Sequence, residues 1–265
     1  MELGKLGLWT FQLDLQPMAR AREAVAELEA LGYGAIWVPE AVGREPFANC
    51  SMLLSGGERI VLATGIASIH ARTAMTMQAG WKTVSEAYPG RFLLGLGVSH
   101  QPMVEGVHGH AYDKPYSTMV NYLDGMDRGM FFATGPTEAP QRVLAALGPK
   151  MLKLSAERGL GAHPYFVPVE HTAIARTTMG SEARLLVEQM AVLEQDAGAA
   201  RTIARTATNV RAGAREPYDA CVECSGVDAC IATCIRAAKS GGKCVLVGIG
   251  ANMAGQAYDI AGTSE

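Results

Sequence analysis

Polar and aromatic side chains follow several short apolar runs of this sequence. Trp9 ends the first run, and Glu40 follows the second. Two histidines, His70 and His100, stand after later runs, and a third, His163, stands at a strand end between Ala162 and Pro164. Carboxylate and imidazole groups bind substrates and transfer protons, and an indole packs well against a planar ring. We therefore predict Glu40 and the three histidines as catalytic residues of a site that also binds a flat ring system.

Each of these residues also has a purely structural interpretation. Glu40 could pair with an arginine, and each histidine could hydrogen-bond a loop carbonyl. The glycines Gly95 and Gly97 favour close packing of their strand over binding of a phosphate. The His108-Gly-His110 stretch suggests a metal ligand pair, but no acidic or cysteine partner stands at ligand spacing, so we predict no metal site.

Apolar runs alternate with helical patterns over the first two hundred residues. The runs expected to form strands are Leu6–Thr10, Ala35–Val38, Ile60–Ile66, Phe92–Val98, Arg142–Leu147, Gly161–Val167 and Glu188–Leu193. The helical patterns are clearest over Pro17–Leu31, Thr73–Ala87 and Lys150–Arg158. The early runs are apolar throughout, as in parallel strands covered on both faces, so the pattern predicts an α/β fold. Seven strands in regular order favour a closed barrel, whose site lies at the carboxyl ends of the strands.

Four stretches carry a family resemblance: Gly4–Thr10, Trp37–Glu40, Ala63–Ile66 and above all Tyr88–His100, with its Pro-Gly-Arg-Phe and Gly-Leu-Gly. They resemble the luciferase-like monooxygenase superfamily. Within it they are most similar to the oxidoreductases that depend on the deazaflavin coenzyme F420. The likeness covers roughly residues 3 to 205 and implies a TIM-like (β/α)8 barrel.

The resemblance also implies an activity and a cofactor site. The expected reaction is hydride transfer between coenzyme F420 and a small organic substrate, with FMN as the alternative cofactor of a monooxygenase. A non-prolyl cis peptide is expected around Gly65-Ile66-Ala67, where it would back the central ring of the deazaflavin. The residues expected to bind the cofactor are Trp9, Gly65, Ile66, Ala67, Ser68, Val98, Ser99 and Tyr165.

The last quarter of the chain departs from that family. Tyr218–Gly226 and Ala237–Gly250 resemble a medium-chain, zinc-type alcohol or sorbitol dehydrogenase, in which this segment forms a Rossmann-type βαβ unit. We therefore interpret the chain as a chimera, with a barrel portion over 1–206 and a dehydrogenase-like segment over 207–265.

The dehydrogenase-like segment has a clear pattern of its own. Tyr218–Cys224 and Lys243–Ile249 are expected as strands, and Asp228–Lys239 as the helix between them. A right-handed βαβ unit occurs in both folds. The segment could therefore supply the missing eighth strand of the barrel or leave one strand surplus.

Five of the six cysteines lie in this last quarter. Cys221 and Cys224 are three residues apart in an expected strand, which places their side chains on opposite faces, so zinc is not predicted. The glycine fingerprint that cradles a dinucleotide is also missing, which disfavours a nicotinamide dehydrogenase. Since the native closing elements of the family are replaced, a catalytically inactive, structural barrel with a vestigial pocket remains the alternative.

The composition limits the kinds of partner that this chain is expected to bind. The chain has 265 residues, a formal net charge of −3 and 49% hydrophobic residues. A chain with this weakly acidic net charge is not expected to bind nucleic acid or an anionic membrane. The start of the sequence lacks the pattern of a secretory signal, so a cytoplasmic location is expected. A homodimer is left open.

Overall fold

The structure is a computed structural model, and it describes residues 1–192 and 243–249. The strands are β1 (Leu6–Trp9), β2 (Ala35–Val38), β3 (Val61–Thr64), β4 (Ala67–Ser68), β5 (Phe92–Gly97), β6 (Gln141–Leu144), β7 (Gly161–Ala162), β8 (Arg184–Val192) and β9 (Lys243–Ile249). The α-helices are α1 (Met18–Ala30), α2 (Pro46–Leu54), α3 (Ala74–Ala87), α4 (Gln101–Gly106), α5 (Pro115–Asp127), α6 (Pro149–Arg158) and α7 (Val169–Met179). A 3-10 helix, η1, covers Gln12–Leu15.

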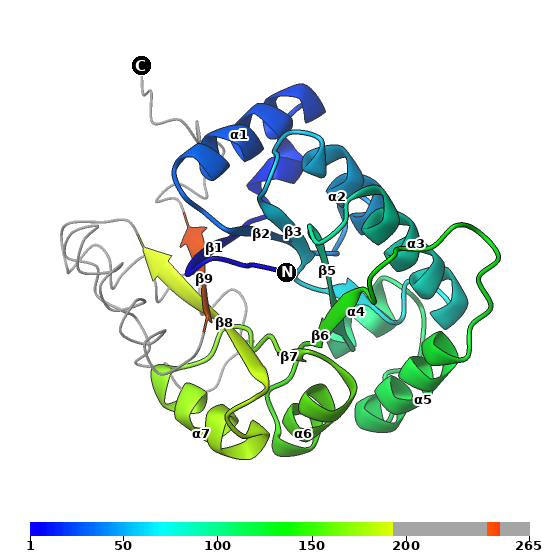
Figure 1. Cartoon of the computed structure of the whole chain (residues 1–265). Helices are drawn as coiled ribbons and strands as arrows, with labels where there is room; N and C mark the ends of the chain where they lie inside the picture. The colour runs from blue at the N-terminus through cyan, green and yellow to red at the C-terminus, as the bar shows by residue number, and fades with distance from the viewer. Residues whose placement is uncertain (193–242, 250–265) are drawn as a thin grey trace.

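The strands form one closed, parallel ring. Over the described residues the sheet order is β3-β2-β1-β9-β8-β7-β6-β5-β4, and an additional pairing of β3 with β5 joins the two sides. The short strand β4 pairs with β5 outside this ring, which leaves eight strands in the barrel wall. Figure 1 shows the strands at the centre with the helices around them. The predicted barrel fold is confirmed.

Lys243–Ile249, predicted as the last strand, closes the barrel. As β9 it pairs in parallel with β1, where Val245 lies opposite Gly7. On its other side it pairs with β8, where Val245 lies opposite Glu188. The strand therefore takes the eighth position in the wall and is not surplus.

The remaining predictions for the last quarter lie outside the described residues. These are the Tyr218–Cys224 strand, the Asp228–Lys239 helix and the boundary between 206 and 207. The division into two parts consequently stays a prediction.

The largest differences from the expected strand boundaries are in β6, β7 and β8, while β1, β3 and β5 are one to three residues shorter than expected. β6 begins one residue early, at Gln141, and ends at Leu144. β7 has only two residues, because Pro164 has no N–H to donate to a ladder and Phe166 has a left-handed φ of 54°. β8 is longer than expected and begins at Arg184.

The barrel wall separates two apolar layers, as alternating strand residues require. Trp9, Trp37 and Leu93 belong to the cluster that fills the barrel interior. Ile36 and Leu94, their neighbours in β2 and β5, instead pack in the layer beneath the helices. Aromatic rings from β1 and β2 therefore fill the interior just below the carboxyl ends of the strands.

Four helices were missed in the sequence, namely α2, α4, α5 and α7. α2 begins with a proline, and the Glu45 side chain before it accepts a hydrogen bond from Ala48 N at 2.7 Å, which caps the helix. α5 also begins with a proline, at Pro115. Within the described ranges, no helix is both long and apolar enough to cross a membrane.

Candidate active site

Gly65–Ala67, which follow β3, form a bulge that contacts Trp9 of β1. The indole N–H of Trp9 donates a 2.8 Å hydrogen bond to Gly65 O. A Cβ added to Gly65 would lie 2.7 Å from Trp9 Nε1, so the close approach of these two residues requires glycine. The Gly65–Ile66 peptide bond is cis, as the family resemblance implied.

The glycines of β5 fit against the same bulge. A Cβ on Gly95 would lie 2.0 Å from Thr64 O, and one on Gly97 would lie 2.5 Å from the Ile66 side chain. Thr64 Oγ1 also donates to Gly95 O at 2.7 Å. The interpretation of these glycines as close-packing residues is confirmed, and they hold Ile66 against β5.

Glu40 is one half of a nearly buried ion pair. Arg72 binds its carboxylate through both guanidinium nitrogens, with Nη1–Oε2 at 2.9 Å, and the two side chains are each 10% exposed. Ser68 N donates to the same carboxylate at 2.7 Å. Arg72 lies over the Phe47 ring, and its carbonyl accepts from the Tyr122 hydroxyl at 2.8 Å. The Glu40 carboxylate thus joins β4 to the loop that carries His70. The catalytic role of Glu40 stays a prediction.

His70 belongs to a cluster of rings at the mouth of the barrel. Its ring centroid lies 6.4 Å from that of His110 and 6.1 Å from that of Tyr112. The Tyr112 hydroxyl donates to Ser99 O at 3.3 Å. Burial, together with His110 and His108, lowers the pKa of His70. Its buried Nε2 has no hydrogen-bond partner among the described residues, so it can accept or donate a bond to a ligand.

His163 lies inside the barrel, below the rim. It is 1% exposed and stacks on Trp37, with ring centroids 4.2 Å apart. Its Nδ1 lies 2.7 Å from Leu186 O, an acceptor, so Nδ1 carries the proton. Nε2 is buried and without a partner in the described part of the chain. Burial lowers the pKa of His163 to about 4.

Protonation of His163 makes stability depend on pH. An unfolded histidine titrates near 6.5, so between pH 6.5 and about 4 the unfolded chain takes up a proton that folded His163 does not. We expect the free energy of unfolding of the wild type to fall by about 3 kcal/mol over this range. The His163→Phe variant should not show this loss. Urea unfolding from pH 7 to pH 4 measures the difference, and parallel losses in the two proteins would contradict it.

The four predicted catalytic residues thus fall in different surroundings. Glu40 is ion-paired, His70 is in the ring cluster, His163 is in the interior, and His100 is exposed just before α4.

Several of the predicted cofactor-binding residues lie in contact with one another, unlike the four predicted catalytic residues. Trp9 contacts Tyr165, with ring centroids 5.5 Å apart, and holds the Gly65 bulge. Ser99 lies at the end of β5 with a left-handed φ of 57°. Ala67 instead packs in the outer layer, so its side chain does not face the barrel interior.

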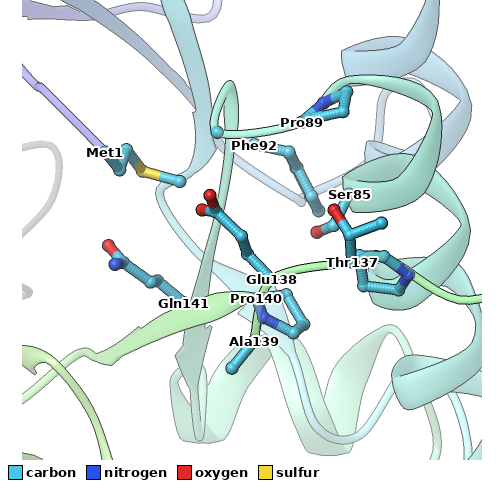
Figure 2. Close-up of a pocket in the computed structure, with 11 residues that line it drawn as sticks. Met1, Ser85, Pro89, Phe92, Thr137, Glu138, Ala139, Pro140 and Gln141 are labelled. Atoms are coloured by element: carbon cyan, nitrogen blue, oxygen red, sulfur yellow. The ribbon is translucent and has the colours of Figure 1, made fainter.

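A small pocket lies at the opposite end of the barrel. Figure 2 shows it beside Phe92 and Gln141, the first residues of β5 and β6, and Ser85 of α3. Its volume is about 40 Å³, room for a few water molecules. Since barrel enzymes place their chemistry at the carboxyl ends of the strands, this pocket is not part of the candidate site.

Comparison with known proteins agrees with this geometry. A profile of the luciferase-like monooxygenase family matches residues 1–222. The chain belongs to this family. The match extends beyond the predicted boundary at residue 206.

The relatives of this luciferase-like chain include a protein whose name refers to coenzyme F420. A protein of Mycobacterium tuberculosis, named as a coenzyme F420-dependent oxidoreductase, is 33% identical over 125 residues, which are 47% of this chain and 36% of that protein. The matched segment therefore spans about a third of the length of this relative.

Solved structures share most or nearly all of the fold at low sequence identity. An F420-dependent secondary alcohol dehydrogenase, in complex with an F420-acetone adduct, has a TM-score of 0.74 at 14% identity and covers 94% of each chain. The F420-dependent tetrahydromethanopterin reductase of Methanopyrus kandleri has a TM-score of 0.69 at 13% identity, over 95% of each chain. A type II Baeyer-Villiger monooxygenase of Pseudomonas putida, in complex with FMN, has a TM-score of 0.58 at 13% identity, over 79% of this chain and 74% of that one.

Two features of the site in this luciferase-like barrel were not apparent from the sequence. Glu188 was assigned only to a strand, yet it is a fully buried carboxylate in the middle of β8. A charged residue inside an apolar strand is the signal that could have revealed it. His108 and His110 were considered only as metal ligands, whereas the structure places them in the ring cluster with His70. No group of side chains suited to a metal occurs in the ranges that the structure describes.

Proposed function

We propose that this chain is an oxidoreductase that transfers a hydride between coenzyme F420 and a small organic substrate. The observation that carries the proposal is the Gly65–Ala67 bulge, held by the Trp9 indole and packed on Gly95 and Gly97. This arrangement offers a firm backing for a planar ring at the catalytic end of a barrel. The F420-dependent proteins among the relatives and structural neighbours support the choice of cofactor.

The residues at this end fit a deazaflavin ring. Gly65 has no side chain to separate the bulge from Trp9, and Trp9 with Tyr165 provides an aromatic wall. His70 Nε2, which has no partner within the described residues, is available to a polar group of the cofactor or substrate. When bound, the deazaflavin supplies the hydride chemistry.

The side chains of the protein then bind, orient and exchange a proton. His70 is our candidate for proton exchange with the substrate, because its lowered pKa leaves the ring unprotonated at neutral pH. The Glu40–Arg72 pair holds the Ser68–Arg72 loop and so fixes where His70 stands.

Ligand titration tests the proposal. The protein is titrated with F420, FMN and NAD while its tryptophan fluorescence is followed, and oxygen consumption is measured with reduced FMN. We expect micromolar binding of F420 and no binding of NAD. Binding of FMN alone, with oxygen consumption, would replace the proposal by a flavin monooxygenase. Binding of none of the three would favour a barrel without catalytic function.

Trp9→Phe is expected to weaken F420 binding about tenfold, because Gly65 O loses its hydrogen-bond donor and the bulge loses its support. Trp81→Phe is the matched control. The Trp81 indole donates to Gln141 O at 3.2 Å, at a distance from the site, so its loss should lower stability without changing F420 affinity. Equal affinity losses in both variants would contradict the assigned role of Trp9.

We also propose that the dehydrogenase-like segment over 207–265 completes the barrel. The pairing of Lys243–Ile249 with both β1 and β8 supports this part of the proposal. Its origin from a zinc-type dehydrogenase rests on the sequence resemblance alone.

A further inference from the structure

We infer that Glu188 is a positioning residue, which holds the segment from Pro164 to Phe166 and thereby the ring of Tyr165. This inference rests on the proposed function, since Tyr165 is one wall of the proposed ring site. It assigns a role to a buried carboxylate that the proposed chemistry does not otherwise use.

Two hydrogen bonds join Glu188 to this segment. Its carboxylate Oε2 accepts a short hydrogen bond from Phe166 N, and its own backbone N donates to Pro164 O at 2.9 Å. The side chain is 0% exposed and lies on the interior face of β8, like Leu186 two residues earlier. Both ends of a three-residue segment are therefore attached to one residue.

The segment needs such support because its own backbone provides little. β7 ends at Ala162, and Pro164 has no N–H to extend the ladder. Phe166 has a φ of 54°, in the left-handed region that residues other than glycine seldom adopt. A backbone in this region persists where its surroundings fix it, and the carboxylate of Glu188 is bonded to the N–H of that same residue.

From this segment, contacts lead directly to the candidate site. The ring of Tyr165 lies 5.5 Å from that of Trp9, and Trp9 donates its indole N–H to Gly65 O. Glu188 thus reaches the bulge through a continuous chain of contacts. Displacement of Phe166 would move Tyr165 away from Trp9 and open the aromatic wall.

The presence of a polar side chain at position 188 supports this role. Its neighbours Leu185, Leu186 and Val187 are buried apolar residues, and burial of a polar group is unfavourable unless it is hydrogen-bonded. An apolar residue at 188 would leave the Phe166 N–H without this acceptor. A side chain whose function is to accept this hydrogen bond accounts for a polar residue at position 188.

Glu188→Gln and Glu188→Met separate the hydrogen bond from the shape of the side chain. Both residues are close to glutamate in size, but only glutamine can accept a bond from Phe166 N. Leu185→Ala is the stability control, because it removes packing from the outer face of the same strand. Each protein is titrated with F420 and FMN, and is digested briefly with chymotrypsin, which cleaves after aromatic residues such as Tyr165 and Phe166.

We expect Glu188→Met to bind F420 about tenfold more weakly and to be cleaved faster at Tyr165 or Phe166. Glu188→Gln should remain close to wild type in both measurements, and Leu185→Ala should lose stability without faster cleavage at these sites. The inference is overturned if Glu188→Met matches wild type, if Glu188→Gln behaves like Glu188→Met, or if Leu185→Ala reproduces the effect. If wild type binds neither F420 nor FMN, the proposed function fails, and the cleavage pattern alone decides the role of Glu188.

Discussion

Val245→Pro is expected to lower the free energy of unfolding by about 3 kcal/mol or more. Val245 lies in the middle of β9, opposite Gly7 of β1 and Glu188 of β8. Proline removes a backbone N–H, and β9 has no free edge at which that loss would be harmless. The variant should therefore weaken the pairing of β9 with a neighbouring strand and open the barrel there.

Urea unfolding followed by circular dichroism measures this effect. Val245→Ile keeps the backbone N–H and a β-branched side chain, and it should unfold close to wild type. A proline variant as stable as wild type would show that Lys243–Ile249 does not close the barrel. The proposed site would then lose its scaffold, since Trp9 stands at the end of β1.

Gly95→Ala is expected to destabilise the protein by about 3 kcal/mol and to abolish F420 binding. The added methyl group would lie 2.0 Å from Thr64 O, an atom of the backbone of the neighbouring strand β3. The clash cannot be relieved by a side-chain rotation, so β3 and β5 must separate where the bulge begins.

Gly106→Ala serves as the control for this substitution. Gly106 ends α4, and a Cβ there meets nothing within 4 Å. Alanine is the better helix former, so stability should be unchanged or slightly higher. Thermal unfolding and F420 titration measure both variants. If Gly95→Ala retains wild-type stability, the close contact of β3 with β5 is not a structural requirement.

Much of the barrel could be predicted because its pattern is local. β2 and β9 have the predicted bounds. For β2 the reason is that a fully buried parallel strand is apolar along its whole length, so its limits are visible in the sequence. β7 could not be predicted in the same way. Its two residues are too few to show a period, and the apolar residues that follow it belong to a loop shaped by Pro164 and Phe166.

The candidate site could be predicted only in part. Trp9 and the Gly65–Ile66 bulge were found because the family resemblance carries them in short, specific motifs. The partner of Glu40 was not found, because Arg72 stands 32 residues away and no local pattern links the two. His163 was expected on the rim, yet the pleat of β7 and the stacking on Trp37 turn it into the interior.

The sequence by itself determined the family, the parallel α/β architecture and the short motifs that contain residues of the proposed ring site. These depend on periodicity and on residues adjacent in the chain. Only the tertiary structure decided that Lys243–Ile249 meets Leu6–Trp9, that Arg72 neutralises Glu40, and that Glu188 holds Phe166. Each of these contacts joins residues distant in sequence and forms only when the elements that carry them pack together, which no local pattern records.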